Sequence, residues 1–247
     1  MDKFKAVILA GGKGTRMESD LPKVLHKVCG ETMVHYTIKA AKDAGATDVI
    51  VVVGYNGQLV KREIVDVVDF AEQHEQLGTG HAVMCAKNLI GTEGDVVVLC
   101  GDTPLITADT IRKLYELHKH EYNGVTVLSA ILDDPTGYGR IIRDEDGRFL
   151  RIVEHKDCTE EELKVNEINS GMYVFNAEAL SASLGLLTND NAQGEYYLTD
   201  TVAIIKKSGL KINALPVDDV NEILGVNTIP QLKEAEEIMK ARLGDEK

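Results

Sequence analysis

Long hydrophobic runs are missing from this chain of 247 residues. Its longest apolar stretches, such as residues 49–53 and 96–100, have the length of a β-strand. A membrane-spanning helix needs about 20 apolar residues. The first residues, MDKFKAVILAGG, contain no long apolar segment followed by a small-residue cleavage site, which is the pattern of a secretion signal. The sequence therefore predicts no membrane insertion and a cytoplasmic protein.

Clusters of cysteine and histidine are also missing. The four cysteines are scattered and form no CxxC pair, and the seven histidines show no metal-binding spacing. This excludes a zinc site and is typical of reduced, free thiols. No GxSxG motif and no Cys–His pairing marks a nucleophile. Chemistry that needs only positioning and charge, such as phosphoryl or nucleotidyl transfer, is compatible with this absence.

Positive charge is scarce overall but concentrated in one place. Lys and Arg number 27 against 40 Asp and Glu, a net charge of -13. This excludes a broad nucleic-acid-binding surface, which needs a basic face. Residues 11–27 nevertheless contain Lys13, Arg16, Lys23 and Lys27 against only Glu18 and Asp20. That segment can therefore attract an anionic ligand.

The first half of the chain alternates apolar runs with amphipathic stretches. Strands are expected at 6–10, 48–53 and 95–100, and helices at 33–44, 58–65, 80–89 and 107–119. Continuous apolar runs are buried on both faces, which is typical of a parallel sheet. Strands that alternate with helices predict a Rossmann-like, doubly wound α/β fold with a mixed, mostly parallel sheet.

The second half changes character. The turn DEDG (144–147) lies between apolar pairs and predicts a β-hairpin, expected as an antiparallel insertion over the sheet for the substrate. Further strands are expected at 125–132 and 168–175, and helices at 198–207 and 229–243. No linker-like composition and no repeat interrupts the chain. We expect one domain over 1–228, followed by a C-terminal helix over 229–247.

The stretch LAGGKGTRM (9–17) directly follows the first strand and has three interpretations. A dinucleotide fingerprint GxGxxG fails because its third glycine position is Met17. A P-loop GxxxxGK[ST] fails because no glycine lies five positions before Gly12. The third is the pattern GxGTR with a later Pro-Lys, here GGKGTRMESDLPK.

The third interpretation has a physical basis. Glycines let backbone N–H groups approach an anion closely. Lys13 and Arg16 add charge, and a guanidinium can hold two phosphate oxygens at once. Pro22 stiffens the chain so that Lys23 can reach the same phosphates. This favours a phosphate-binding loop over an ordinary tight turn with solvated cations.

Asp102, in VVVLCGDTPLI, follows the carboxyl end of an expected strand, where open α/β sheets bind ligands. A carboxylate beside a phosphate loop suggests Mg²⁺, which takes one or two protein carboxylates plus phosphate oxygens. Asn227, in EILGVNT, is a candidate second ligand. The alternatives are an aspartate that caps the turn before Pro104 and a turn asparagine.

Two further groups of polar residues are candidates for ligand binding. Gln73, Gly78 and Thr79 precede a helix and can read a flat base, or Thr79 can simply cap that helix. Residues alone leave these two interpretations open. Gly139, Glu154 and Asn169 suit sugar hydroxyls if they face a cleft. Each alone is more often a polar residue of the surface.

Taken together, the motifs resemble the sugar-1-phosphate nucleotidyltransferases. They are most similar to the N-terminal uridyltransferase domains of the bacterial bifunctional enzymes that make UDP-N-acetylglucosamine. The strings EQLGTGHAV, EHKD and NAQGEYYLTD discriminate within the family, and the matching strings run in the family's order from residue 9 to 228. The resemblance implies that UTP and N-acetylglucosamine-1-phosphate give UDP-N-acetylglucosamine, a cell-wall (peptidoglycan) precursor, and pyrophosphate, with Mg²⁺ as cofactor.

The resemblance also implies a role for each matching position. The positions that match contacts to the nucleotide are Leu9, Ala10, Gly11, Gly12 and Thr15, and those that match phosphate contacts are Lys13, Gly14, Arg16 and Lys23. Gln73, Gly78 and Thr79 match the uracil-reading positions, and Asp102 and Asn227 match the Mg²⁺ ligands. Gly139, Glu154 and Asn169 match the contacts to the N-acetylglucosamine group. Arg16, Lys23 and Asp102 are the expected catalytic residues.

This chain departs from the family at three points. Gly12 stands where this family usually has alanine, and Cys100 where some members have tyrosine. The bifunctional enzymes continue into a hexapeptide-repeat β-helix with acetyltransferase activity, and no such repeat follows here. We therefore expect no acetyltransferase activity, a closing helix that resembles the linker, and a trimer only where a hexapeptide domain is present. The alternatives are another sugar nucleotidyltransferase, using glucose-1-phosphate or deoxythymidine triphosphate, and a non-catalytic nucleotide-sugar-binding module.

Overall fold

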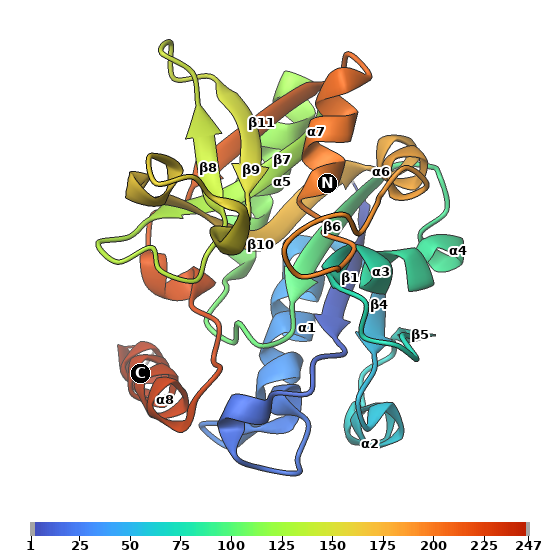
Figure 1. Ribbon diagram of the computed structural model, residues 1–247. Helices are drawn as coiled ribbons and strands as arrows, with labels where there is room; N and C mark the ends of the chain where they lie inside the picture. Colours follow the sequence, from blue (N-terminus) through green and yellow to red (C-terminus); the bar gives the residue numbers. More distant parts are fainter. Residues whose placement is uncertain (1–2, 246–247) are drawn as a thin grey trace.

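The computed structural model describes residues 3–245 and is organised around one twisted sheet (Figure 1). Its main path has the strand order β11-β7-β10-β6-β1-β4-β5. The strands are β1 (Phe4–Ala10), β4 (Ala46–Val53), β5 (Asp69–Glu72), β6 (Asp95–Cys100), β7 (Asn123–Ile131), β10 (Glu167–Asn176) and β11 (Lys211–Pro216). Outside this sheet, β2 (Lys27–Val28) and β3 (Glu31–Thr32) form a small antiparallel hairpin.

The sheet is mostly parallel, as expected. β1 pairs in parallel with β4 and β6, and β4 pairs in parallel with β5. β11 and β7 form a further parallel pair, whereas β10 runs antiparallel to both of its neighbours. The register places Leu9 opposite Cys100. The segments that follow β1 and β6 therefore leave the sheet side by side, which positions the candidate site.

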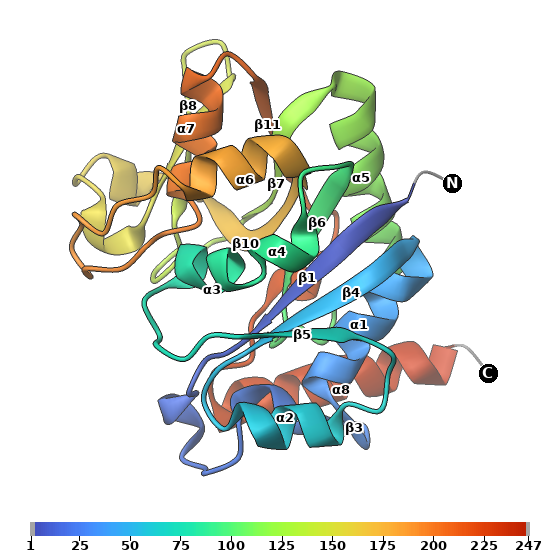
Figure 2. The same ribbon diagram turned by 90° about the vertical axis from the view of Figure 1, so that its right-hand side faces the viewer.

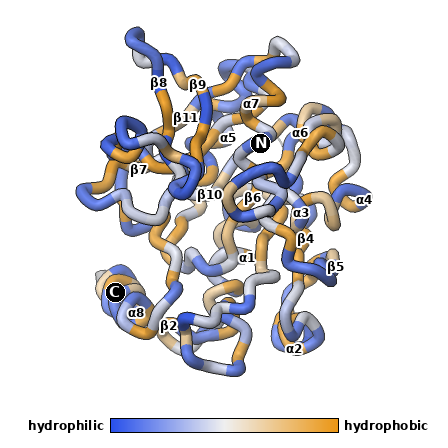
Figure 3. Tube along the Cα trace, in the orientation of Figure 1, coloured by the Kyte–Doolittle hydropathy of each residue, from blue (hydrophilic) through white to orange (hydrophobic). Residues whose placement is uncertain are grey.

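Helices cover both faces of the sheet, which confirms the doubly wound arrangement (Figure 2). One apolar core, which includes Ile8, packs beneath α1 (Met33–Ala44), α2 (Gly57–Glu63) and α5 (Ala108–Glu121). The other, which includes Val7, packs beneath α3 (Thr79–Cys85), α4 (Lys87–Ile90), α6 (Ala177–Leu184) and α7 (Asp200–Lys207). Successive residues of a strand point to opposite faces, so the continuous apolar runs of the sequence serve both cores. Figure 3 shows these apolar residues along the central strands.

Several expected elements differ from those in the structure. The helix expected at 80–89 is two helices, α3 and α4, with Ala86 between them. The helix expected from residue 198 begins at Asp200. The sequence analysis missed β2, β3, β5, β11 and α6. An available signal for α6 was Asn176, whose side chain caps the helix by accepting a hydrogen bond from Ala179 N.

The predicted hairpin forms but is not separate from the sheet. It consists of β8 (Arg140–Arg143) and β9 (Phe149–Val153). Arg140 of β8 pairs with Ile168 of β10, so the hairpin is joined to the main sheet and the expected insertion over it is wrong. The cause is β10, whose first residues pair with both β7 and β8 before a break in register between Asn169 and Tyr173. The break lies directly after Asn169, one of the predicted sugar-binding residues.

A buried ionic cluster lies at the N-terminal end of β6, away from the end that Cys100 occupies. Asp95 is 6% exposed and lies 3.5 Å from His118 Nε2 and 2.9 Å from Lys119 Nζ. Burial on its own would raise the pKa of Asp95, but the hydrogen bonds from His118 and Lys119 outweigh it, and the pKa falls to about 2. A carboxyl with a lower pKa in the folded state stabilises the fold above its unfolded pKa, and this stabilisation is lost as the pH falls toward 2.

We expect Asp95→Asn to lower the free energy of unfolding at pH 7 by about 2 kcal/mol. The difference from the wild-type should shrink as the pH is lowered from 5 to 2, where the wild-type carboxyl also becomes protonated. Urea unfolding at several pH values measures this. Asp190→Asn, at an exposed position, is the control. A difference that stays constant with pH would contradict the assignment.

No helix within residues 3–245 is long and apolar enough to cross a membrane.

Candidate active site

The candidate site lies where β1 and β6 end. Gly101 N donates a hydrogen bond of 2.9 Å to Leu9 O and holds the two exits together. A cavity of about 300 Å³ opens there. Its lining includes the predicted residues Leu9, Ala10, Gly11, Gly12, Lys23, Gln73, Gly78, Thr79 and Asp102, together with Val24, Gln76, Ala82, Cys100 and Glu195.

The predicted phosphate loop folds through one residue that must be glycine. Gly14 has a φ of 64°, and a Cβ at that position would lie 2.6 Å from Lys23 Cβ. Only glycine permits both the left-handed backbone and this close approach. The loop then closes in a short 3₁₀ turn, Thr15–Met17, in which Met17 N donates to Gly14 O. Lys23 is therefore held directly against the loop, as the sequence predicts.

Four predicted residues from separate segments converge beside this loop. Lys23 Nζ contacts the carboxylate of Asp102 and lies 2.8 Å from Asn227 Oδ1. Arg16 Nη2 donates to the same Asn227 oxygen at 3.0 Å. Residues up to 211 positions apart in the sequence are thus brought together. This is the most concentrated arrangement of charge at the candidate site.

Lys13 and Thr15 are not part of this convergence. Lys13 Nζ lies 5.4 Å from the centre of the Tyr55 ring, a cation–π distance. Thr15 is exposed within the 3₁₀ turn. Both remain on the loop, but neither lines the cavity beside it.

The donor set around Lys23 fits a divalent cation. The Lys23 ammonium lies between two oxygens, the carboxylate of Asp102 and the amide oxygen of Asn227, so a positive charge already occupies the space that they share. A carboxylate and an amide oxygen are hard donors of the kind that Mg²⁺ prefers. No group of three or more His, Cys, Asp and Glu suited to a metal occurs between residues 3 and 245. One carboxylate suits Mg²⁺ that is completed by phosphate oxygens.

The predicted base-reading residues are tied to one another. Gln73 is buried, and its amide donates to Gly78 O at 3.1 Å and lies 3.3 Å from His81 Nδ1. Gly78 has a φ of 106°, and a Cβ there would lie 2.6 Å from Tyr196 O. The Gln73 amide is consequently fixed at the cavity wall, and His81, to which the sequence assigned no role, supports it.

Thr79 does not cap its helix. Helix α3 begins at Thr79 with Gly78 as the preceding residue and has no side-chain cap. The Thr79 hydroxyl instead accepts a hydrogen bond of 3.1 Å from Leu198 N. The alternative interpretation as a capping residue is therefore wrong, and Thr79 joins the cavity to the second half of the chain.

The three predicted sugar-binding residues meet at the break in β10. Asn169 N donates to Gly139 O at 2.8 Å, and a Cβ on Gly139 would lie 3.4 Å from Glu154 Oε2. The Asn169 side chain donates to Tyr173 Oη at 2.8 Å and accepts from Gly171 N at 3.1 Å. The backbone of Gly139 and both the backbone and the side-chain amide of Asn169 are thus held in place by hydrogen bonds.

Cys100 connects this group to the nucleotide-side cavity. Its Sγ donates to Gly171 O at 3.5 Å while the residue also lines the cavity. Burial raises the pKa of the Cys100 thiol to about 12, and the negative charge of Asp102 adds to the effect. The thiol therefore stays neutral, in agreement with a site that uses no thiolate nucleophile.

Glu154 lies in an acidic and largely buried environment. Its Oε1 accepts a hydrogen bond of 3.0 Å from Thr199 Oγ1. Burial raises the pKa of Glu154, and the nearby carboxylates of Asp200, Asp157 and Glu195 raise it further. A carboxyl with a raised folded-state pKa destabilises the fold once the pH exceeds its unfolded pKa. The ionised Glu154 side chain therefore lowers the free energy of unfolding at neutral pH.

Glu154→Gln is therefore expected to raise the melting temperature at pH 7, because it removes a buried charge among like charges. At pH 4, where the wild-type carboxyl binds a proton, the two proteins should melt at closer temperatures. Each kcal/mol relieved corresponds to roughly 2–4 °C for a domain of this size. Glu162→Gln is the matched control, because hydrogen bonds from Thr159 and Arg151 lower the pKa of Glu162 and its loss should lower the melting temperature at pH 7. An unchanged or lower melting temperature for Glu154→Gln at pH 7 would contradict this account.

The sequence analysis did not single out three polar residues of this region. Gln76 and Glu195 line the cavity but were not singled out within EQLGTGHAV and NAQGEYYLTD. The phenol of Tyr138 is the third. Burial raises the pKa of Tyr138, Asp102 raises it further and Arg16 lowers it, so the ring lies within the field of the charged cluster. Its position beside Gly139 in GYGR was the available signal.

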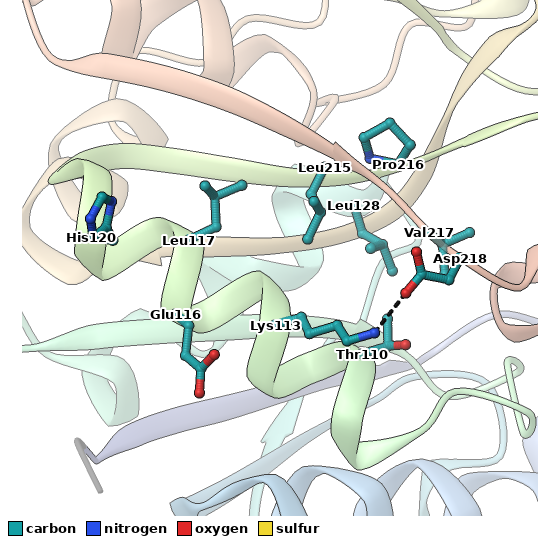
Figure 4. A pocket seen from close by; sticks show the side chains of 10 residues that line it. All are labelled: Thr110, Lys113, Glu116, Leu117, His120, Leu128, Leu215, Pro216, Val217 and Asp218. Atoms are coloured by element: carbon teal, nitrogen blue, oxygen red, sulfur yellow. Dashed lines mark hydrogen bonds and ion pairs between the residues drawn. The ribbon is translucent and has the colours of Figure 1, made fainter.

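A second, larger cavity of about 450 Å³ lies between α5 and β11 (Figure 4). Its apolar part is formed by leucines of α5, β7 and β11, and an ion pair of 2.6 Å joins Lys113 to Asp218 at its rim. None of the predicted site residues lines it. Lys113 and Asp218 are paired with each other there, and the cavity lacks the convergence of charged residues found beside the phosphate loop.

Comparisons with known proteins show the family to which the chain belongs. A family model described as Nucleotidyl transferase matches residues 5–219. The Bifunctional protein GlmU of Caldanaerobacter subterraneus subsp. tengcongensis is 56% identical over 245 residues, which are 99% of this chain and 53% of the relative. That of Clostridioides difficile is 50% identical over 242 residues, 98% of this chain and 53% of the relative. The chain thus spans about half the length of these curated relatives.

A solved structure of a UDP-glucose pyrophosphorylase complexed with UDP-glucose shares the fold. Its TM-score is 0.79 at 19% identity, over 97% of this chain and 99% of that chain. A Bacillus anthracis protein described as a putative glucose-1-phosphate thymidylyltransferase gives a TM-score of 0.74 at 23% identity, over 95% and 94% of the two chains.

Proposed function

Because this chain belongs to the nucleotidyl transferase family, we propose that it transfers the uridylyl group of UTP to N-acetylglucosamine-1-phosphate. The products are UDP-N-acetylglucosamine and pyrophosphate. The observation that carries the proposal is the convergence of Arg16, Lys23, Asp102 and Asn227 beside the glycine loop. The similarity to GlmU proteins over nearly the whole chain supports the choice of uridine and N-acetylglucosamine.

The reaction requires one bond to form and one to break at the α-phosphorus of UTP. An oxygen of the sugar phosphate attacks that phosphorus, and the bond to the β-phosphate oxygen breaks on the opposite side. The electron pair leaves with pyrophosphate. No covalent intermediate on the protein is needed, in keeping with the neutral Cys100 thiol. Catalysis then depends on positioning and on compensation of negative charge.

The residues of the charged cluster divide this work between them. Arg16 is proposed to hold the phosphates that depart as pyrophosphate, since a guanidinium can bind two oxygens at once. Lys13, which lies outside the cluster on the same loop, is proposed to add positive charge to these phosphates. Lys23 is proposed to steady the attacking phosphate, because it lies between the loop and Asp102. Asp102 and Asn227 would hold Mg²⁺, which when bound supplies positive charge to the two reacting phosphates. With Asp102 and Asn227 engaged by the metal, the Lys23 ammonium would no longer contact their oxygens and could bind a phosphate.

Substrate choice is assigned to the two groups of residues outside the charged cluster. The Gln73 amide and the backbone at Gly78 and Thr79 are proposed to read uracil, since all three line the cavity beside the loop. Gly139, Glu154 and Asn169 are proposed to bind the N-acetylglucosamine group. Their mutual contacts support this assignment, because a carboxylate and an amide held together suit the hydroxyls and amide of that sugar.

A pyrophosphate-release assay tests the proposal. UTP, deoxythymidine triphosphate, ATP and GTP are each combined with N-acetylglucosamine-1-phosphate or glucose-1-phosphate, with Mg²⁺ and with chelator. We expect the highest kcat/KM for UTP with N-acetylglucosamine-1-phosphate, and loss of turnover with chelator. Preference for glucose-1-phosphate or deoxythymidine triphosphate would replace this proposal with another sugar nucleotidyltransferase. Nucleotide binding without turnover would replace it with a non-catalytic binding module.

A further inference from the structure

The C-terminal helix α8 (Ile229–Asp245) lies beside the phosphate loop, in agreement with both ribbon views (Figures 1 and 2). A separate apolar cluster joins them, which we term the Met17 cluster. Its buried members are Met17, Val28, Met33, Leu105, Val226, Ala235 and Met239. Met239 rather than Ile229 completes the packed face of α8, because Met239 is 7% exposed whereas Ile229 is 39% exposed.

Met17 is the anchor of the loop in this cluster. Arg16 is exposed and reaches Asn227, whereas the next residue, Met17, is only 1% exposed. Between Gly12 and Asp20, Met17 is the one buried residue of the described chain. Three glycines in this loop make its backbone intrinsically mobile. Because the Met17 side chain is buried in the cluster to which α8 contributes Ala235 and Met239, its packing restricts where the neighbouring Arg16 can lie.

The first turn of α8 fixes the residue that Arg16 contacts. Val226 N donates to Asp102 O at 2.9 Å, and Asn227 N donates to Gln231 Oε1 of α8 at 2.9 Å. The other end of α8 is attached through Arg242, which donates to Leu105 O at 2.7 Å and to Asp219 Oδ2 at 3.0 Å. Leu105 lies three residues after Asp102 in the same segment. Helix α8 is thus joined to the segments that supply Arg16, Asp102 and Asn227.

We propose that α8 is a positioning element of the active site: by seating Met17 and fixing Asn227, it holds Arg16 in the orientation that binds the triphosphate. This inference rests on the proposed function of the site. Met17 and Met239 are positioning residues that act through Arg16 and touch no substrate. Helix α8, which the sequence analysis compared with a linker, would then contribute to the activity of the nucleotidyltransferase domain.

The test compares three methionine-to-alanine changes in one cluster. Met17→Ala and Met239→Ala open a cavity between loop and helix, and Met33→Ala opens one in the same cluster from α1. All three should lower the melting temperature. We expect the first two to lower kcat, and with it kcat/KM, about tenfold at 20 °C, with little change for Met33→Ala. Met17→Leu, which conserves volume, should recover most of the loss.

Limited trypsin digestion supplies a readout that is independent of turnover. Cleavage after Arg16 should be faster in Met17→Ala and Met239→Ala than in the wild-type or Met33→Ala. Equal kinetics and equal cleavage for Met17→Ala and Met33→Ala would overturn the inference. If the wild-type itself shows no turnover, the proposed function fails, and the cleavage rates still decide whether α8 holds the loop.

Discussion

Asp102→Ala is expected to lower kcat/KM for UDP-N-acetylglucosamine synthesis by about 10²–10³, in line with the loss of one preorganised charge from a transition state. Asp102 provides the carboxylate of the proposed Mg²⁺ site and contacts Lys23. Removing it takes away a metal donor and leaves the Lys23 ammonium with Asn227 alone. The loss should persist at saturating Mg²⁺, and steady-state pyrophosphate release measures it.

A control separates this effect from general loss of acidic charge. Asp218→Ala removes an exposed carboxylate that pairs with Lys113. Both residues line the second cavity, which contains no residue of the phosphate loop. Its kcat/KM should remain near that of the wild-type. Asp102→Ala with near wild-type turnover at saturating Mg²⁺ would contradict the assignment of Asp102 to the reacting centre.

Arg16→Ala is expected to have a similar effect, about 10²–10³ in kcat/KM. The guanidinium is exposed on the loop and reaches Asn227. We expect most of the loss in kcat, because the charge of pyrophosphate grows as the bond to the α-phosphorus breaks. Arg16→Lys keeps the charge but loses the planar pair of donors, so it should recover only part of the rate. Single-turnover rates with saturating UTP measure the chemical step.

Arg62→Ala provides the matched control for Arg16. Arg62 lies on α2, is 74% exposed at its side chain and pairs with Glu63. It should leave both kinetic constants unchanged. If Arg16→Ala changed only KM for UTP and left kcat intact, Arg16 would serve in binding alone and its role in the departure of pyrophosphate would be wrong.

The sequence predicted those parts of the fold whose signals are local. Continuous apolar runs identified β1 and β6, and the helix at 33–44 was predicted with the bounds of α1. The short strand β5 (DFAE) and the edge strand β11 (KINALP) were missed, since neither contains a continuous apolar run. The antiparallel direction of β10 depends on pairing with β6 and β7, and no local pattern contains that information.

The candidate site followed the same division. The loop, Asp102 and Asn227 were predicted from motifs and from the place where strands end, and the structure brings Arg16, Lys23 and both candidate ligands together. The contact of Lys13 with Tyr55 and the bond from Leu198 to Thr79 were not predictable, because they join segments through tertiary packing. The burial of Met17 against α8 belongs to the same class. A sequence pattern shows which residues carry chemistry, but not which neighbour holds them.

Phosphorus NMR of one reaction mixture tests the central claim most directly. Purified protein is given UTP and N-acetylglucosamine-1-phosphate with Mg²⁺, and in parallel with chelator. Uridylyl transfer predicts that the signals of UTP and the sugar phosphate fall together, while UDP-N-acetylglucosamine and pyrophosphate rise in a one-to-one ratio, only when Mg²⁺ is present. Unchanged UTP, or its hydrolysis to products without a sugar nucleotide, would contradict the account.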